Sequence, residues 1–342
     1  MSQSQAGAGT RPRTLVTGAT GFLGRHLVTQ LREAGHHVVA LCRKDEPELA
    51  ALGVEIRRGD ILDGASVRAA AEGCEVLFHG AGKVSRKPED AEELFRVHVE
   101  GTKTTLDAAR VAGIRRVVYA STSGTVAVSE DADDVRDEDA ADPIELVARW
   151  PYYRSKLYAE RAALDRSGPS FEVVSVNPTL LLGPGDIHAS STGDVVKFLE
   201  KKVPFVPAGG MSFVDARDAA AAMILALEKG RGGERYLVSA VNLTIEAFFA
   251  RLERISGVKG PRLRTPRSLL LARAGAEIFG KLQKHVPLHG DLDRISAEMA
   301  QVFWYVDASK AKNELGWSPR DPGDTLADTV EDLRSRGIVW PE

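Results

Sequence analysis

The chain alternates short apolar runs with longer amphipathic segments from Thr14 onward. The apolar runs are rich in β-branched residues. The segments between them, such as 24–35 and 89–113, carry apolar residues at helical spacing and end at glycine. This alternation is typical of parallel strands joined by crossover helices, and runs this apolar suit a sheet buried on both faces. Six strands are predicted, with the sequences TLVTG, HVVALC, VEIRRG, EVLFHG, RRVVYAS and FEVVSVN.

The alternation breaks after Asn177, where a loop rich in Gly, Pro and Ser begins. The predicted fold is therefore of the α/β class, a doubly wound Rossmann sheet followed by a smaller C-terminal subdomain. An alanine-rich helix predicted over 215–229 is expected to return to the sheet. The expected division is a flexible tail at 1–12, a Rossmann domain at 13–178 with 214–240 returning to it, and a substrate-binding subdomain formed by 179–213 and 241–342.

Composition and charge favour a small-molecule ligand. The 342 residues are 43% hydrophobic and 27% charged, and the net charge of −3 with a pI near 6.3 provides no basic field for nucleic acid. The two cysteines, Cys42 and Cys74, lack metal-type spacing, so no metal site is predicted and a cytoplasmic location is expected.

No stretch of the sequence has the length and apolar character of a transmembrane helix. The N-terminus lacks the apolar region of a secretory signal, and the apolar stretch 268–280 is interrupted by Arg273 and Glu277. We expect this stretch to be a helix packed in the second domain, and a membrane-surface face is the alternative. A homodimer is left open.

A glycine-rich segment, TGATGFLG, joins the first predicted strand to the first predicted helix. Gly18 permits a tight turn, Gly21 lets the backbone approach a pyrophosphate, and Gly24 lets helix and strand pack closely. The unpaired N–H groups at the helix start favour a phosphate. This context predicts a dinucleotide site, and the GxxGxxG spacing resembles that of short-chain dehydrogenases.

The end of the second predicted strand indicates which dinucleotide binds. An NAD site would place a carboxylate about 20 residues after the glycines, but Arg43 and Lys44 stand there. A guanidinium suits a 2′-phosphate, so NADP(H) is predicted, with NAD(H) as the alternative. The competing interpretation is that both cations belong to a solvated loop.

A Tyr-x-x-x-Lys motif, Tyr152 and Lys156, opens a further predicted helix and places both side chains on one face. A free phenol is a poor acid at neutral pH, but a neighbouring ammonium is expected to lower its pKa. The fifth strand ends in the hydroxyl-rich segment ASTSGTV, where Ser123 is the preferred residue to hold a substrate oxygen and Thr122 is the runner-up. Together these residues predict proton transfer to or from a substrate oxygen.

These motifs, with RVHVEGTKTTLDAAR, VNPTLLLGPGD, SFVDARDAA and VDASKAKNELGWSPR, resemble the extended short-chain dehydrogenase/reductases. The resemblance is to the dihydroflavonol-4-reductase-like branch of the NAD-dependent epimerase/dehydratase family, which includes proteins called hopanoid-associated sugar epimerases. It spans about Thr14 to Leu333. The cofactor residues that the motifs and the resemblance imply are Gly18, Thr20, Gly21, Phe22, Leu23, Gly24, Arg43, Lys44, Asp60, Ile61, Gly80, Ala81, Gly82, Thr122, Tyr152, Lys156, Asn177 and Pro178. The implied pocket residues are Lys83, Ser85, Ser123, Tyr153, Leu180 and Phe213.

The chain departs from this family pattern at two places. His98 stands where the family usually has Asn, and we expect it to be a hydrogen-bonded core residue, with a role in a proton relay as the alternative. Nucleotide-sugar enzymes of the family often carry an Arg directly after Gly-Pro, whereas this chain continues with Gly185 and Asp186. The absence of that Arg favours a less charged substrate. The preferred function is an NADP(H)-dependent ketone or aldehyde reductase; a sugar epimerase or dehydratase and a non-catalytic nicotinamide sensor are the alternatives.

Overall fold

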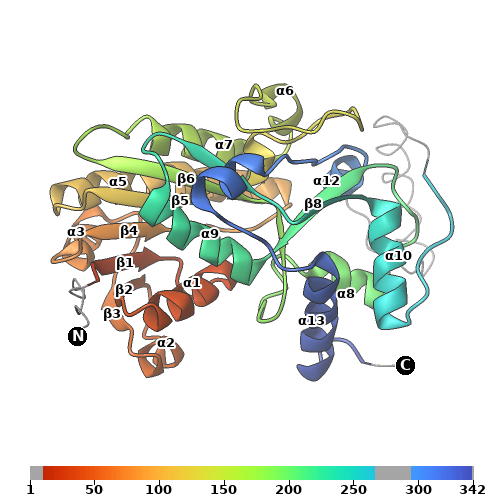
Figure 1. Ribbon diagram of the computed structural model, residues 1–342, viewed down its shortest axis with the longest axis horizontal. Helices are drawn as coiled ribbons and strands as arrows, with labels where there is room; N and C mark the ends of the chain where they lie inside the picture. The colour runs from red at the N-terminus through yellow and green to blue at the C-terminus, as the bar shows by residue number, and fades with distance from the viewer. Residues whose placement is uncertain (1–10, 266–293, 341–342) are drawn as a thin grey trace, which may run out of the picture.

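A parallel sheet forms the centre of the computed structural model, which describes residues 11–265 and 294–340 (Figure 1). Its strands are β1 (Arg13–Thr17), β2 (His37–Cys42), β3 (Glu55–Arg58), β4 (Val76–His79), β5 (Arg116–Ala120), β6 (Glu172–Pro178) and β9 (Arg235–Val238). The order is β3-β2-β1-β4-β5-β6-β9, with every neighbouring pair parallel. The strands are thus wound outward from a switch point between β1 and β4. The predicted fold class is confirmed, and all six predicted strands occur.

Helices cover both faces of this sheet, and this explains why its strands are apolar almost throughout. Their bounds are α1 (Phe22–Glu33), α2 (Pro47–Ala51), α3 (Gly64–Ala71), α5 (Gly101–Val111), α6 (Ile144–Val147), α7 (Pro151–Leu164) and α9 (Ala216–Lys229). In β1, Val16 belongs to the core beneath α1 and α9, whereas Leu15 belongs to the core beneath α3, α5 and α7. Figure 1 shows α1 and α9 side by side on one face.

The segment predicted as one helix over 89–113 consists of several helical turns. They are the 3-10 turn η1 (Pro88–Asp90), α4 (Ala91–Phe95), the π-helical turn η2 (Arg96–Glu100) and α5. Gly113, with φ +95°, follows the end of α5, in agreement with the predicted stop. The π-helical turn contains His98, a buried residue that lines the cavity described below.

The alanine-rich helix α9 starts at its predicted place, because the Asp215 side chain accepts a hydrogen bond from the Arg217 N–H (2.8 Å) and caps the helix. After α9 the chain enters β9, which pairs with β6 at the edge of the large sheet. The expectation that residues 214–240 return to the sheet agrees with this path. The division into domains otherwise stays a prediction.

A second, smaller sheet packs with the C-terminal helices. Its order is β10-β8-β7, and the apolar core around it includes Leu182, Phe213, Leu252 and Val330. Residues 1–10 and the stretch 268–280 lie outside the described residues. The elements are β7 (Leu180–Leu182), β8 (Gly210–Asp215), β10 (Val241–Thr244), α8 (Gly193–Leu199), α10 (Ile245–Ser256), α12 (Arg294–Met299), the turn η4 (Ala311–Leu315) and α13 (Pro322–Ser335).

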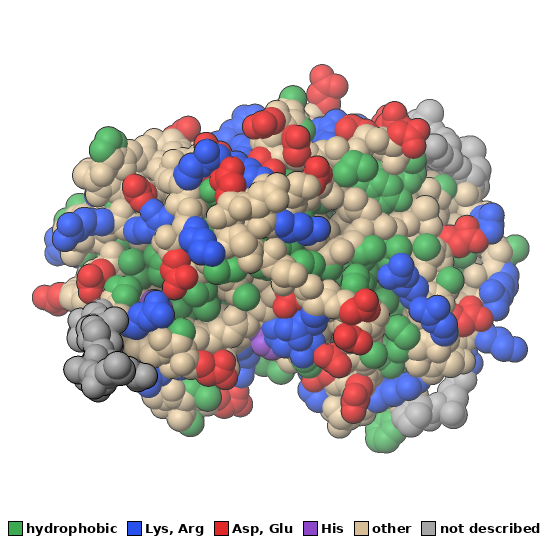
Figure 2. Space-filling view, viewed as in Figure 1, with side chains coloured by type: hydrophobic (Ala, Val, Ile, Leu, Met, Phe, Trp, Pro, Cys, Tyr) green, Lys and Arg blue, Asp and Glu red, His purple; other side chains and the backbone are tan. Residues whose placement is uncertain are grey.

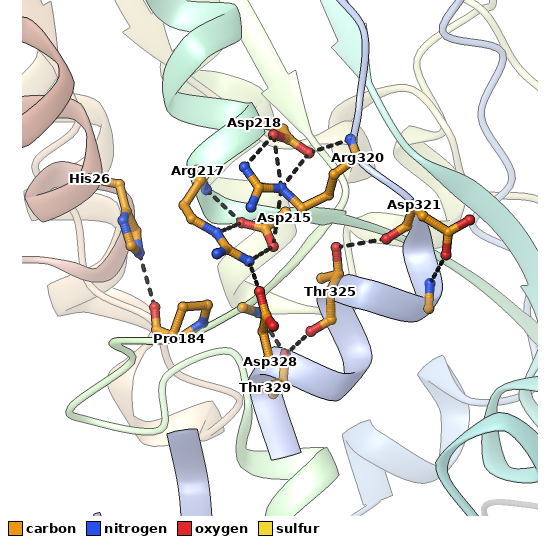
Figure 3. Close-up of polar contacts among 12 residues, drawn as sticks. His26, Pro184, Asp215, Arg217, Asp218, Arg320, Asp321, Thr325, Asp328 and Thr329 are labelled. Atoms are coloured by element: carbon orange, nitrogen blue, oxygen red, sulfur yellow. Dashed lines mark hydrogen bonds and ion pairs between the residues drawn. The ribbon is translucent and has the colours of Figure 1, made fainter. Parts of the chain in front are cut away.

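A cluster of ion pairs joins the start of α9 to the C-terminal segment (Figure 3). Arg217 binds the buried carboxylate of Asp215 through Nη2 (2.7 Å) and also Asp328 of α13 (2.5 Å). Arg320 binds Asp218 through Nε (3.0 Å) and Nη2 (2.9 Å), and its backbone N–H donates to the same carboxylate (2.8 Å). Burial opposes ionisation of Asp215, but the Arg217 guanidinium holds its pKa below the usual value.

The Asp218 contact predicts a measurable loss of stability on mutation. Asp218→Asn leaves the three donor groups of Arg320 facing a neutral side chain of 10% exposure, so we expect the free energy of unfolding to fall by about 3 kcal/mol. Arg264→Gln breaks an ion pair whose side chains are 70% and 53% exposed, and should cost about 0.5 kcal/mol. Urea denaturation measures both. Equal losses would contradict the structural role of Asp218.

Candidate functional site

A cavity of about 960 Å³ opens at the carboxyl ends of the central strands, between the large sheet and the C-terminal elements. This edge, near a topological switch point, is where open α/β sheets bind ligands. The glycine-rich loop, the end of β5, the start of α7 and the loop after β7 all contribute to its wall. Residues predicted from three separate motifs therefore line one cavity.

The glycine-rich loop has the geometry that a pyrophosphate requires. Gly18 has φ +76°, and a Cβ there would lie 2.5 Å from the Gly80 backbone, so β1 and β4 approach too closely for any side chain. A Cβ on Gly24 would lie 2.0 Å from the Gly18 carbonyl oxygen. Gly21 caps α1 without a side-chain hydrogen bond, and the first turn has no acidic residue. The N–H groups at this helix end thus fit an anionic phosphate.

The predicted cofactor residues do not all line the cavity. Thr20 and Ala81 belong to the loops of this cradle, whereas Arg43, Lys44, Asp60 and Ile61 follow β2 and β3 beyond the cavity wall. The members that line the cavity are Gly18, Gly21, Phe22, Leu23, Gly24, Gly80, Gly82, Thr122, Tyr152, Lys156 and Pro178.

Asn177 does not flank the cavity as expected. Its side chain is fully buried and donates hydrogen bonds to the Thr122 carbonyl oxygen (3.2 Å), the Thr125 hydroxyl (3.0 Å) and the Glu160 carboxylate. Glu160, also fully buried, accepts a bond from Ser121 as well. Asn177 points to this carboxylate because side chains alternate along β6, and the alternation turns this one inward.

Tyr152 and Lys156 lie one turn apart on α7, and both line the cavity. The Lys156 ammonium donates to the Tyr119 hydroxyl (3.1 Å) and the Ala120 carbonyl oxygen (2.7 Å), rather than to the Tyr152 phenol. Burial lowers the pKa of Lys156 to about 8, against a smaller opposing effect of Glu160. Burial also raises the pKa of Tyr152, so the expected lowering of its pKa by the ammonium does not hold in this structure.

Ser123 is the first residue of a short 3-10 turn after β5 and is 4% exposed, with its side chain at the cavity wall. Thr122 precedes it, and its hydroxyl accepts the Gly124 N–H (3.4 Å). Ser121 also lines the cavity, but its hydroxyl donates to Glu160, so Ser123 and Thr122 are the better candidates to bind a substrate oxygen.

His98 is a hydrogen-bonded buried residue, as preferred from the sequence. Its Nε2 accepts the backbone N–H of Lys83 (3.1 Å), which assigns the proton to Nδ1, and Nδ1 then donates to the Ser155 hydroxyl (2.8 Å). Burial, followed by the charge of Lys156, lowers its pKa to about 3. The ring is therefore neutral, and it stands edge-on to Tyr152 with 5.6 Å between centroids.

Comparison with known proteins agrees with this geometry. Residues 14–239 match the model of the NAD dependent epimerase/dehydratase family. The chain belongs to this family. "Sterol demethylase protein B" of Methylococcus capsulatus is 34% identical over 95% of this chain and 99% of its own length, and "Dihydroflavonol 4-reductase" of Zea mays is 31% identical over 72% and 75%. The crystal structure of gox2253 superposes with a TM-score of 0.83 at 28% identity, covering 96% of this chain and all of the other.

The family and the relatives show that the chain is an NAD(P)-dependent enzyme of the extended short-chain dehydrogenase/reductase kind. The relatives confirm the predicted dihydroflavonol-4-reductase-like branch. Within the residues that the structure describes, no helix combines the length and apolar character needed to cross a membrane, and no three His, Cys, Asp or Glu side chains gather into a metal site.

One part of the cavity wall is rich in aromatic and aliphatic side chains. The Tyr153 ring packs on Trp304 with 4.7 Å between centroids, and Trp304 lies 5.5 Å from Trp150. The predicted residues Lys83, Ser85, Tyr153 and Leu180 line the cavity. Further apolar residues line the cavity and could not be found from the sequence, because no motif marks them. They are Met211, Ile245, Ile295, Met299 and Trp304.

Phe213 is not a pocket residue. It has no exposed surface and belongs to the apolar core of the small sheet, where its ring packs on Phe248 with 6.0 Å between centroids. The expectation was wrong because β8 directs the Phe213 side chain to the face that packs on this core, whereas Ser212, its neighbour, lies on the other face and lines the cavity. Met211 shares the face of Phe213, but it lies nearer the start of β8 and also contributes to the cavity wall.

Charged side chains near the cavity mouth are paired with one another. Arg86, from the loop after β4, binds Asp194 at the start of α8 through both terminal nitrogens (3.1 and 2.8 Å). Lys83 is paired with Asp90 (3.0 Å) and Glu93. In the loop just before α8, the Asp186 carboxylate accepts the N–H groups of 191 (2.8 Å) and 192 (2.9 Å) and so fixes a loop of the cavity wall.

The buried position of Lys156 predicts that it loses its proton near pH 8, far below a free lysine. The test is an NMR titration of protein labelled with ¹³C at lysine Cε, freed of any bound cofactor. A Lys156→Met spectrum assigns the signal. A Lys156 signal that stays unchanged up to pH 10 would contradict the prediction.

Proposed function

We propose that this protein is an NADP(H)-dependent reductase that converts a ketone or aldehyde of a small, largely apolar substrate to the alcohol, or catalyses the reverse oxidation. The observation that carries the proposal is that Tyr152, Lys156 and Ser123 line the same cavity as the glycine-rich loop. An acid, a cation and a hydroxyl beside a dinucleotide cradle are the groups that carbonyl reduction requires.

The residues divide the proton chemistry between them. The nicotinamide, when bound, supplies the hydride to the carbonyl carbon or takes it from the alcohol. Ser123 donates a hydrogen bond to the substrate oxygen, and the Tyr152 O–H bond breaks as its proton passes to that oxygen. Burial alone disfavours the phenolate that remains on Tyr152, and the Lys156 ammonium, one turn along α7, offsets part of that cost once the proton has left. In the oxidation the same transfers run in reverse.

Two observations support an uncharged substrate. The rings of Tyr153 and Trp304, packed over the buried Trp150, give the cavity an apolar wall, and the ion pairs of Arg86 and Lys83 neutralise charge at that cavity. The relatives named for a sterol demethylase and a dihydroflavonol reductase agree with a ring-containing apolar substrate. A cytoplasmic location is part of the same proposal, since Cys42 and Cys74 are both buried and free.

Preference for NADP(H) rests on the corner formed by β2 and β3. Arg43 and Lys44 are exposed directly after β2, and Arg58, at the end of β3, pairs in register with Cys42. Asp45 is the carboxylate nearest in sequence, and it is engaged by Arg58 (3.5 Å). Three cations against one paired carboxylate favour a 2′-phosphate. Use of NAD(P), without a preference between the two cofactors, already follows from membership of the family.

Tyr152→Phe should lower turnover by at least about 100-fold, because the acid is lost, while cofactor affinity stays within about twofold. NADPH oxidation with a panel of aromatic, steroid and aliphatic carbonyl compounds measures turnover, and calorimetry measures binding. Tyr158→Phe, an exposed position on the same helix, is the control. Retained turnover in Tyr152→Phe would refute the mechanism, and retained cofactor with no net NADPH consumption would favour an epimerase.

Arg43→Asp should shift the ratio of kcat/KM for NADPH over NADH toward NADH by at least about tenfold, since it replaces a phosphate-binding cation with a carboxylate that suits a ribose hydroxyl. Arg115→Asp is the control. It makes the same charge change just before β5, at the amino ends of the strands, whereas Arg43 follows the carboxyl end of β2, so it should leave the ratio unchanged. An unchanged ratio in Arg43→Asp would overturn the NADP assignment.

A further inference from the structure

The surroundings of Lys156 contain an acceptor that no motif indicated. Tyr119, the fourth residue of β5, is 2% exposed, and its hydroxyl accepts a hydrogen bond from the Lys156 ammonium (3.1 Å). The same ammonium lies 4.7 Å from the centroid of the Tyr119 ring. Lys156 therefore contacts both the hydroxyl and the π face of one side chain.

The Tyr119 hydroxyl begins a buried chain of hydrogen bonds. It is bonded to the Thr102 hydroxyl, which contacts Nε2 of His79 (3.0 Å), and Nδ1 of His79 contacts the Thr17 hydroxyl (2.7 Å). Thr17 accepts the N–H of Ala81 (3.4 Å) in the loop after β4. Thr17, His79 and Thr102 are each 1% exposed, so water does not substitute for a missing partner.

The charge on Lys156 fixes the first step of this chain. An ammonium has no acceptor, so Tyr119 must accept from it, and the other directions follow if the Tyr119 hydroxyl gives its own proton to Thr102. Thr102 then donates to Nε2 of His79, and the ring proton on Nδ1 donates to Thr17. Each donor is used once along this path, and it runs from α7 to the strand that carries the glycine-rich loop.

We infer that Tyr119 is a positioning residue whose hydroxyl holds the Lys156 ammonium in place and keeps it charged. Its importance for catalysis rests on the proposed function; its effect on Lys156 does not. The groups that face the ammonium are Glu160, which favours the charge, His79 and His98, which are neutral rings, and Tyr152.

The competing interpretation is that Tyr119 only fills the core beneath α5 and α7. Tyr119→Phe separates the two, because it keeps the ring and the packing and removes only the hydroxyl. Tyr236→Phe is a matched control: this tyrosine is also buried in a parallel strand, its hydroxyl donates to Glu314 (2.9 Å), and Lys310 lies 4.9 Å from its ring centroid.

The experiment is the NMR titration of Lys156 in protein freed of cofactor. Loss of an acceptor favours the neutral amine, so Tyr119→Phe should lower the pKa of Lys156 by about one pH unit, and the charged fraction at pH 8 should fall about fivefold. Thr102→Val, which leaves Tyr119 in place, should lower it by less. Tyr236→Phe should leave it unchanged.

Activity provides a second readout. The alkaline limb of the pH profile of kcat should move to lower pH in Tyr119→Phe, with the dissociation constant for NADPH at pH 6 unchanged. An unchanged or raised pKa of Lys156 in both Tyr119→Phe and Thr102→Val would overturn the inference. If no carbonyl compound is reduced by the unaltered protein but the titration shifts as expected, the inference stands and the proposed function fails.

Discussion

A lysine in the interior of a protein keeps its charge only if acceptors replace the water it has lost. Lys156 meets this condition with the Ala120 carbonyl oxygen and the Tyr119 hydroxyl, and with the Glu160 carboxylate on the next turn of the same helix. Much of the site depends on this constraint, because Glu160 also binds Ser121, Thr125 and Asn177 at the ends of β5 and β6. One buried carboxylate thus connects the helix that carries the acid and the cation to the strand end that carries Ser123.

Elements whose chemistry is local could be predicted from the sequence. The strands were recognisable as apolar runs, α9 from its alanines, and the cofactor cradle from three glycines placed between a strand and a helix. Tyr152 and Lys156 were found for the same reason, since one turn of helix fixes their separation. These features need only the backbone geometry of a few neighbouring residues.

Features that depend on distant partners could not be predicted. Asn177 and Phe213 were assigned to the cavity from their place in a motif, but a one-residue alternation along a strand decides which side chain faces inward. Tyr119 and Glu160 carry no motif of their own, and the aromatic wall at Trp304 comes from a segment nearly 150 residues after α7 begins. The pKa of Tyr152 depends on the burial of the whole site, which no spacing in the sequence expresses.

The pairing of Arg86 with Asp194 has a consequence for how the cavity wall responds to salt. The two residues come from the loop after β4 and the start of α8, and their side chains are 38% and 44% exposed. The pair is bidentate, which makes it stronger than a typical surface ion pair, but dissolved salt still screens charges that are this accessible to water. The attraction between these two segments of the cavity wall therefore weakens as the salt concentration rises, whereas the packing of Tyr153 on Trp304 does not depend on salt.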